Sequence, residues 1–193
     1  MVRAVVAGVG LAGMVSIVLA VLAPRAFPPL PSLGTLPDAA LRTHQGTPIT
    51  LAQLRGRVWV AGFIFTRCAG QCPLITSRMA ALQTALPELE LVSISVDPVY
   101  DTPERLTAYA ARAGAGERWR FLTGSPEVIL PLVREGFRFA VGQDGTPEEP
   151  ITHSVRLVLV DQAGVIRGMY DATEAAAMPR LRDDAARLLR ESP

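Results

Sequence analysis

The sequence predicts a single α/β domain, a mixed sheet with helices on both faces, preceded by a membrane anchor. Strand-like and helix-like segments alternate along the chain and end in a hairpin and a helix, which is typical of such a sheet. One long segment near the N-terminus carries no charged side chain. The 193 residues are 49% hydrophobic, which suits one domain of ordinary size and excludes a disordered chain.

The anchor is predicted from residues 4–23, the run without a charged side chain. Twenty helical residues rise about 30 Å, which is the thickness of the hydrocarbon layer of a membrane. A cleaved signal peptide is the alternative, but Pro24 directly after the candidate cleavage site disfavours cleavage. We therefore expect an uncleaved anchor over residues 1–23 in a bacterial inner membrane, with the N-terminus in the cytoplasm and the domain in the periplasm.

Small residues recur at every fourth place in this run, at Ala4, Gly8, Ala12, Ser16 and Ala20. Such a stripe would allow two anchors to pack as a homodimer, although an alanine-rich composition explains it equally well. Residues 8–13 also fit the G-x-G-x-x-G pattern of dinucleotide-binding folds. We reject that interpretation, because the acidic residue expected about 20 positions later is missing.

Five prolines in residues 24–37 predict a stiff, extended spacer, so the domain is expected over residues 38–193. Residues 57–65 are almost continuously apolar and rich in β-forming residues, which predicts a strand covered on both faces. Residues 73–86 carry apolar side chains at helical spacing after a proline, which predicts a helix. Residues 91–96 are predicted to form a second buried strand.

The second half of the chain continues this alternation. Thr102 before Pro103 predicts the start of a helix that runs to about Ala113. The sequence Asp-Gln-Ala-Gly at 161–164 predicts the turn of a hairpin. The other expected elements are a strand over residues 119–122, a short helix over 126–134, the hairpin strands over 154–160 and 165–170, and a closing helix over 174–190. Both tryptophans are expected in the core.

The charge of the chain gives no support to nucleic-acid binding. The 19 basic residues, all of them arginines, and the 18 acidic residues give a formal net charge of +1. A near-neutral domain lacks the cationic footprint that attracts a phosphate backbone. Two cysteines in a chain of this length also exclude a small scaffold held together by disulfides.

The two cysteines, Cys68 and Cys72, carry the strongest functional signal in the sequence. They lie four positions apart, between the first predicted strand and the helix that follows. Unpaired N–H groups and the dipole at a helix N-terminus favour the thiolate, which is the reactive and metal-binding form of cysteine. Two thiols at this spacing can close a disulfide or bind one soft metal ion together. The alternative is that both are small buried hydrophobic residues.

A third metal ligand would have to come from one of the two histidines. His44 lies in a polar, turn-like stretch and is expected on the solvated surface. His153 opens the buried strand SVRLVLV after a polar loop, at an edge of the sheet that can face the cysteines, although a lone histidine is more often structural. A set of Cys68, Cys72 and His153 would suit Cu(I), whereas zinc would need an added water.

Three blocks of sequence resemble the Sco/SenC family. They are GRVWVAGFIFTRCAGQCPLIT (residues 56–76), VSISVDPVYDTPERL (92–106) and THSVRLVLVDQAG (152–164). The blocks occur in order and cover most of the chain after the spacer. Members of this family are membrane-anchored, thioredoxin-like proteins on the outer side of energy-coupling membranes. The resemblance therefore implies a thioredoxin-like fold for residues 38–193.

The resemblance also implies a ligand set and a function. Cys68, Cys72 and His153 would bind copper, as Cu(I) or Cu(II). The chain would deliver this copper to the CuA site of cytochrome c oxidase or reduce the thiols of that site. The expected partner is the copper-bearing oxidase subunit or another periplasmic copper or thiol protein. Asp97 matches a family position near the site, where it either orients a group, faces the partner, or is an ordinary turn residue.

Two positions depart from the family pattern, and neither is an expected ligand. Ala69 stands where the family usually has proline, and Thr152 stands where an acidic residue often precedes the histidine. Loss of that acid removes a charge near the ligands, so the copper affinity of this chain can differ from that of the family.

A thiol–disulfide oxidoreductase is the second interpretation of the same residues. Cys68 would attack a disulfide as the thiolate, and Cys72 would resolve the mixed disulfide. His153 favours the metal interpretation, because a reductase does not need this residue. A copper- or redox-sensing protein that transfers no metal is a third interpretation.

Overall fold

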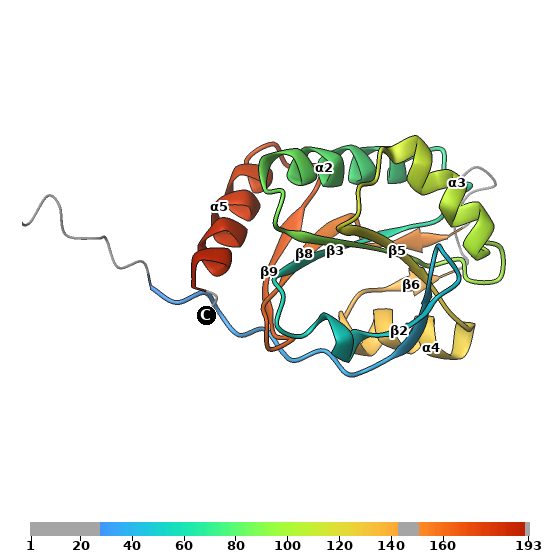
Figure 1. Ribbon diagram of the computed structural model, residues 1–193, viewed down its shortest axis with the longest axis horizontal. Helices are drawn as coiled ribbons and strands as arrows, with labels where there is room; N and C mark the ends of the chain where they lie inside the picture. The colour runs from blue at the N-terminus through green and yellow to red at the C-terminus, as the bar shows by residue number, and fades with distance from the viewer. Residues whose placement is uncertain (1–27, 143–150, 192–193) are drawn as a thin grey trace, which may run out of the picture.

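A computed structural model of the protein describes residues 28–142 and 151–191 (Figure 1). The predicted anchor over residues 1–23 lies outside these ranges. Among the helices within them, none is long and apolar enough to cross a bilayer.

A seven-stranded mixed sheet forms the centre of the described domain (Figure 1). Its strand order is β2-β1-β5-β4-β3-β8-β9. The three central strands run parallel to one another, and their neighbours on both sides run antiparallel. The strands are β1 (Ala40–Thr43), β2 (Pro48–Thr50), β3 (Trp59–Ile64), β4 (Glu90–Ser95), β5 (Trp119–Thr123), β8 (Arg156–Val160) and β9 (Ile166–Asp171).

Helices cover both faces of this sheet, which confirms the predicted mixed α/β architecture. One face carries α2 (Cys72–Ala85), α3 (Pro103–Ala113) and α5 (Ala177–Arg190), and the other carries α4 (Pro126–Pro131) (Figure 1). The π-helical turn η2 (Leu132–Gly136) continues α4, and the short 3-10 helix η1 (Leu51–Leu54) precedes β3.

The predicted start of α3 is confirmed by its cap. The Thr102 hydroxyl accepts a hydrogen bond from the backbone N–H of Arg105 at 3.4 Å, and Pro103 is the first helical residue. Gly114 ends the helix in the left-handed conformation, with φ of 68°, which a residue with a side chain adopts less readily. Pro73 lies in the first turn of α2, as expected.

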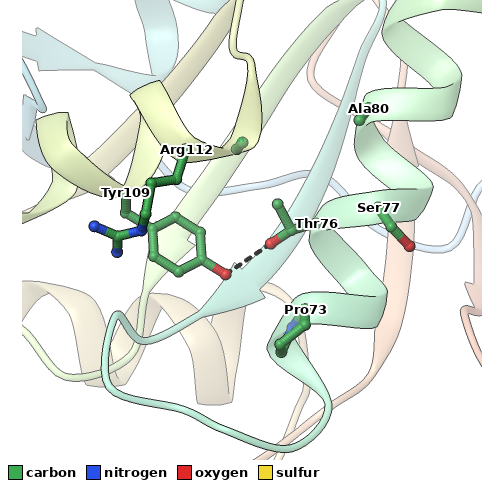
Figure 2. Close-up of a pocket in the computed structure, with 7 residues that line it drawn as sticks. Pro73, Thr76, Ser77, Ala80, Tyr109 and Arg112 are labelled. Atoms are coloured by element: carbon green, nitrogen blue, oxygen red, sulfur yellow. Dashed lines mark hydrogen bonds between the residues drawn. The ribbon is translucent and has the colours of Figure 1, made fainter.

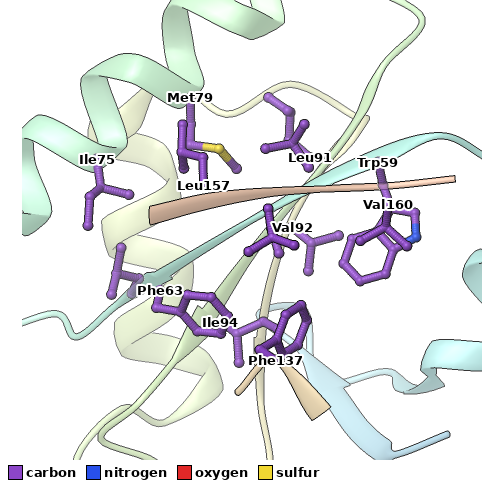
Figure 3. Close-up of a cluster of buried hydrophobic side chains, with 14 of the residues drawn as sticks. Trp59, Phe63, Ile75, Met79, Leu91, Val92, Ile94, Phe137, Leu157 and Val160 are labelled. Atoms are coloured by element: carbon purple, nitrogen blue, oxygen red, sulfur yellow. The ribbon is translucent and has the colours of Figure 1, made fainter. Parts of the chain in front are cut away.

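The core lies on both sides of the sheet. Ile75 and Met79 of α2 are fully buried against one face (Figure 3). Gly62 of β3 allows this close approach, because a Cβ atom there would lie 3.2 Å from the Ile75 side chain. On the other face, the rings of Phe63 and Phe137 pack edge to face with centroids 4.9 Å apart. Both tryptophans are 1% exposed, which confirms them as core residues.

Several short strands differ from the sequence prediction. β1 and β2 form an unpredicted hairpin beside β5. β6 (Val141–Gly142) and β7 (Thr152–His153) form a separate two-stranded sheet. The following strand begins at Arg156 rather than Ser154, so His153 lies on β7 and does not open the long strand. Strands of two to four residues are too short to show a clear periodicity in sequence.

Residues 28–37, the described part of the expected spacer, lie against the domain. The Leu33 N–H donates to the Ile166 carbonyl at 2.9 Å, and the Leu36 N–H donates to the Gly164 carbonyl at 3.0 Å. Leu36 is buried in the hydrophobic core. The proline-rich segment therefore runs alongside β9 in this part of the chain.

Candidate metal centre

The two cysteines lie at the end of the sheet where β3 leads into α2. β3 ends at Ile64, and Cys72 is the first residue of the helix. The backbone N–H of Cys72 donates to Cys68 Sγ at 3.4 Å, so the helix N-terminus stabilises negative charge on that sulfur. No disulfide joins the two cysteines; Cys72 is buried and Cys68 is half-buried.

His153 reaches the same point from a distant part of the chain. The β6–β7 pairing sets His153 opposite Val141, and its Nε2 atom lies 3.5 Å from Cys72 Sγ. The two sulfur atoms and one ring nitrogen all lie within 4.8 Å of one another. The structure thus brings together all three residues that the sequence analysis selects as metal ligands.

The contacts of the His153 ring determine which nitrogen faces the sulfurs. Nδ1 lies 3.0 Å from the backbone carbonyl oxygen of Ser154. Because a carbonyl can only accept, Nδ1 carries a hydrogen, and Nε2 is the nitrogen that faces the cysteines. When Nε2 also carries a hydrogen it can donate to the Cys68 thiolate, and when it does not, it offers its lone pair to a metal ion. Phe65 packs edge to face against the imidazole, with centroids 5.6 Å apart, and supports this orientation.

The surroundings of Cys68 favour its thiolate. A hydrogen bond with the Cys72 thiol lowers the pKa of Cys68, burial opposes the shift, and a hydrogen bond with His153 lowers it further, to about 4. Cys68 is therefore ionised at neutral pH, as a metal ligand or a nucleophile must be.

The loop from Val96 to Thr102, between β4 and α3, holds the residues directly before Cys68. The fully buried Asp101 carboxylate accepts hydrogen bonds from the backbone N–H of Thr66 at 3.1 Å and from its hydroxyl at 2.5 Å. The Ser95 hydroxyl donates to the same carboxylate at 2.6 Å. Burial raises the pKa of Asp101, and these hydrogen bonds oppose the rise.

Asp97, which the sequence placed near the site, is buried and pairs with Arg67 at 2.8 Å. Two aspartates of one loop therefore hold two consecutive residues, Thr66 and Arg67. Asp101 and Arg67 were not among the site residues predicted from the sequence. Two aspartates four positions apart, directly after a buried strand, are the signal that could have indicated this arrangement.

A groove between α2 and α3 opens beside the thiols. Its volume is about 340 Å³, and it begins at Pro73, the residue after Cys72. Thr76 and Tyr109 join its two walls through a hydrogen bond of 2.8 Å between their hydroxyl groups (Figure 2). The Arg112 guanidinium lies 5.5 Å from the centre of the Tyr109 ring. The groove therefore combines an apolar floor with a positive border.

His44 does not belong to the site, and the expectation that it is a solvated surface residue is wrong. Its half-buried ring accepts a hydrogen bond from the backbone N–H of Phe121 at 3.3 Å and packs edge to face against the Phe121 ring. Burial lowers the pKa of His44. These contacts join the end of β1 to β5, inside the sheet.

Two sulfurs and one imidazole nitrogen form a soft donor set. Three such donors suit Cu(I), whereas Zn²⁺ needs a fourth ligand. Ala69 and Thr152, where the chain departs from the family pattern, are both exposed and supply no side-chain ligand of this kind. The residues present at the site therefore fit a monovalent copper ion.

The fold and the site together define a class of protein, a thioredoxin-like domain with a Cys-x-x-x-Cys pair at the start of a helix and a histidine from a later strand. The chain belongs to the SCO1/SenC family, whose family model matches residues 37–189. The resemblance seen in the sequence is thereby confirmed, and so is the thioredoxin-like fold.

Individual relatives agree with this assignment. A protein of Stutzerimonas stutzeri whose name describes it as copper-binding is 32% identical over 145 residues, which cover 72% of this chain and 70% of that protein. A SCO1/SenC family lipoprotein from Bacillus anthracis str. Ames is 30% identical, with a TM-score of 0.77 over 84% of this chain and 99% of that one. BsSco, described as a member of the Sco family of cytochrome c oxidase assembly proteins, is 28% identical, with a TM-score of 0.73 over 82% and 96%.

Proposed function

We propose that the protein binds one copper ion through Cys68, Cys72 and His153 and delivers it during assembly of cytochrome c oxidase. The observation that carries this proposal is the convergence of the three donor atoms within 4.8 Å. Relatives described as copper-binding and as an oxidase assembly protein support it. The recipient would be the oxidase subunit that bears the CuA site.

The three donors differ in their access to solvent, which gives each a separate part in binding. Cys68 is half-buried and ionised, so it is the first sulfur that an incoming Cu(I) ion can reach. Cys72 is buried and His153 is partly buried, so these two residues complete the site from the protein side. A three-coordinate copper ion leaves space for a ligand from the recipient to approach.

The test is a Cu(I) titration of the reduced full-length chain in detergent, followed by metal analysis. The parent is expected to bind one copper ion. Cys68→Ser should remove most of the affinity, because it replaces a thiolate by a neutral hydroxyl, and His153→Ala should weaken binding. His44→Gln is the matched control, because His44 is the other histidine of the chain. If Cys68→Ser and His153→Ala bind copper as the parent does, the ligand set is wrong.

Thiol–disulfide exchange is a second candidate function, favoured by the low pKa of Cys68. The Cys68 thiolate would attack a substrate disulfide and release one substrate thiolate. Cys72 would then displace the second, so that two electrons pass to the substrate and a Cys68–Cys72 disulfide forms. Reduction of a model disulfide by the parent and by His153→Ala separates the candidates. A reductase keeps its rate without the histidine, whereas a metal carrier loses copper affinity.

The location of the protein is part of the same proposal. The uncharged run over residues 4–23 supports an anchor in a bacterial inner membrane with the domain in the periplasm. The protein is then expected to remain in the membrane after carbonate extraction and to be degraded by protease added to spheroplasts. Release by carbonate, or protection from that protease, would contradict this location.

A further inference from the structure

Three large apolar side chains are exposed in the described part of the chain, Leu33, Val99 and Tyr100. Val99 is 79% exposed, and Tyr100 follows it in the loop that holds the residues before Cys68. Single exposed apolar residues are ordinary on protein surfaces, whereas adjacent ones beside a functional site are characteristic of binding surfaces. The loop therefore presents an apolar tip and also contacts Thr66 and Arg67, the two residues before Cys68.

Two arginine side chains stack on Tyr100. The Arg105 guanidinium lies 3.8 Å from the ring centroid, and one of its N–H groups donates to the Tyr100 carbonyl at 2.5 Å. The Arg67 guanidinium lies 4.7 Å from the same centroid. These contacts hold the ring in place before any partner arrives, so docking on it loses little side-chain entropy. We call Arg67, Val99, Tyr100 and Arg105 the Tyr100 surface.

The Tyr100 surface is apolar at its centre and positive at its border. Arg67 forms an ion pair with Asp97, which neutralises part of its charge. Among the described residues, no carboxylate lies within 4.0 Å of the Arg105 guanidinium, including that of the neighbouring Glu104. Tyrosine and arginine are also the residue types that contribute most often to binding energy at protein interfaces. The complementary surface is an apolar patch bordered by carboxylates.

We propose that the Tyr100 surface is the docking site for the protein that receives the copper. That protein would bind here through an apolar patch bordered by carboxylates. This inference rests on the proposed function. Arg67 directly precedes Cys68 in the chain and its guanidinium stacks on Tyr100, so a partner seated on Tyr100 also contacts the segment that carries the half-buried sulfur. The partner that fits is therefore an acidic copper-receiving domain.

Transfer at this surface is a ligand exchange without a redox change. Each bond that breaks between Cu(I) and this chain, two to sulfur and one to the His153 nitrogen, is replaced by a bond to a thiolate or an imidazole of the recipient. The proton of each recipient thiol passes to the solvent when the thiolate binds copper. Copper remains Cu(I) throughout, so no external oxidant or reductant is needed.

The test measures copper transfer from the Cu(I)-loaded full-length chain in detergent to the reduced, metal-free CuA domain of the oxidase from the same organism. Val99→Ser and Tyr100→Ala are expected to slow transfer by at least about tenfold. Arg105→Gln should reduce the dependence of the transfer rate on salt concentration, because it removes an unpaired border charge. Tyr100→Phe keeps the stacked ring and should retain most of the rate.

Two controls separate docking from damage to the copper site. Leu33→Ser removes an exposed apolar side chain that lies beside Ile166, away from the cysteines, and should leave the transfer rate unchanged. Transfer to a small Cu(I) chelator requires no docking, and all variants should perform it at the parent's rate.

The outcomes distinguish this inference from the proposed function. Equal transfer to the CuA domain by the parent, Val99→Ser and Tyr100→Ala overturns the docking surface and leaves the proposed function intact. If the parent transfers copper to the chelator but never to the CuA domain, both the docking surface and the proposed function are overturned. A Tyr100→Ala variant that is slow toward the chelator as well shows a change in the copper site itself, and this result also overturns the docking role.

Discussion

Cys68 and Cys72 have the same side chain and different surroundings. Cys72 is fully buried at the first position of α2, whereas Cys68 is half-buried in the loop before it. Contacts with Cys72 and with His153 favour the charged form of Cys68. Cys68 is therefore the sulfur from which exchange with another molecule can begin, and Cys72 is the inner sulfur of the pair.

The first prediction concerns the pH dependence of Cys68 reactivity. Alkylation of the reduced, metal-free protein by iodoacetamide reports on Cys68, because Cys72 is buried. The thiolate fraction rises with pH through the pKa of about 4, so the rate should be constant near neutral pH and fall by half near pH 4. His153→Ala removes one stabilising hydrogen bond and should move the midpoint upward. A parent midpoint near the ordinary cysteine value of about 8.5 would contradict this environment.

At the scale of elements, the loop between β4 and α3 positions the start of α2. The second prediction is that Thr66→Val destabilises the fold, because it removes the hydroxyl that donates to the buried Asp101 carboxylate at 2.5 Å. A hydrogen bond to a charged group contributes about 1.5–3 kcal/mol, so the free energy of unfolding should fall by about that amount. Thr66→Ser keeps the hydroxyl and should retain the stability of the parent. Urea unfolding curves that coincide for the valine and serine variants would show that this contact does not stabilise the loop.

The longer elements could be predicted because each carries its own signal in the sequence. α3 has an N-cap at Thr102 and a terminating glycine, and β3 is a continuous apolar run. The β6–β7 pair, by contrast, is two residues long in each strand, and long-range packing sets its register. The sequence could therefore suggest that His153 lies near Cys72, but the distance between their side chains depends on the register of β6 and β7 in the folded chain. The pair Asp97 and Asp101 after a buried strand could have pointed to this loop, but the burial of Asp101 depends on its contacts with Thr66 and Ser95, which only the folded chain brings together.

At the scale of the whole molecule, the metal centre and the N-terminal segment lie at opposite ends of the sheet. The cysteines follow the end of β3. Leu33 is hydrogen-bonded to Ile166, and Ile166 pairs with Val160, which lies opposite Trp59 at the beginning of β3. Figure 1 shows the chain entering the domain near α5, far from the first turn of α2.

This arrangement limits how far the domain can lie from the predicted anchor. The Pro28 carbonyl accepts a hydrogen bond from Arg187 near the end of α5, so the chain is attached to the domain from that residue onward. Residues 24–27 alone separate Pro28 from the predicted anchor, and four residues span at most about 14 Å. An anchored domain would therefore stand close to the membrane, with its metal centre at the end that faces away from it.

The attachment of residues 28–37 leads to the third prediction, a difference in stability between two fragments. A fragment that begins at Asp38 lacks Leu36, which is 6% exposed, and the hydrogen bonds that pair this segment with β9. Burial of a leucine contributes about 1.5–3 kcal/mol, so this fragment should be about 2 kcal/mol less stable to urea than one that begins at Pro28. Leu36→Ala in the longer fragment is the matched control and should account for most of the loss. Both fragments should bind copper with the same stoichiometry, because the metal centre lies at the opposite end of the sheet. Equal stabilities would instead show that residues 28–37 behave as a spacer independent of the domain.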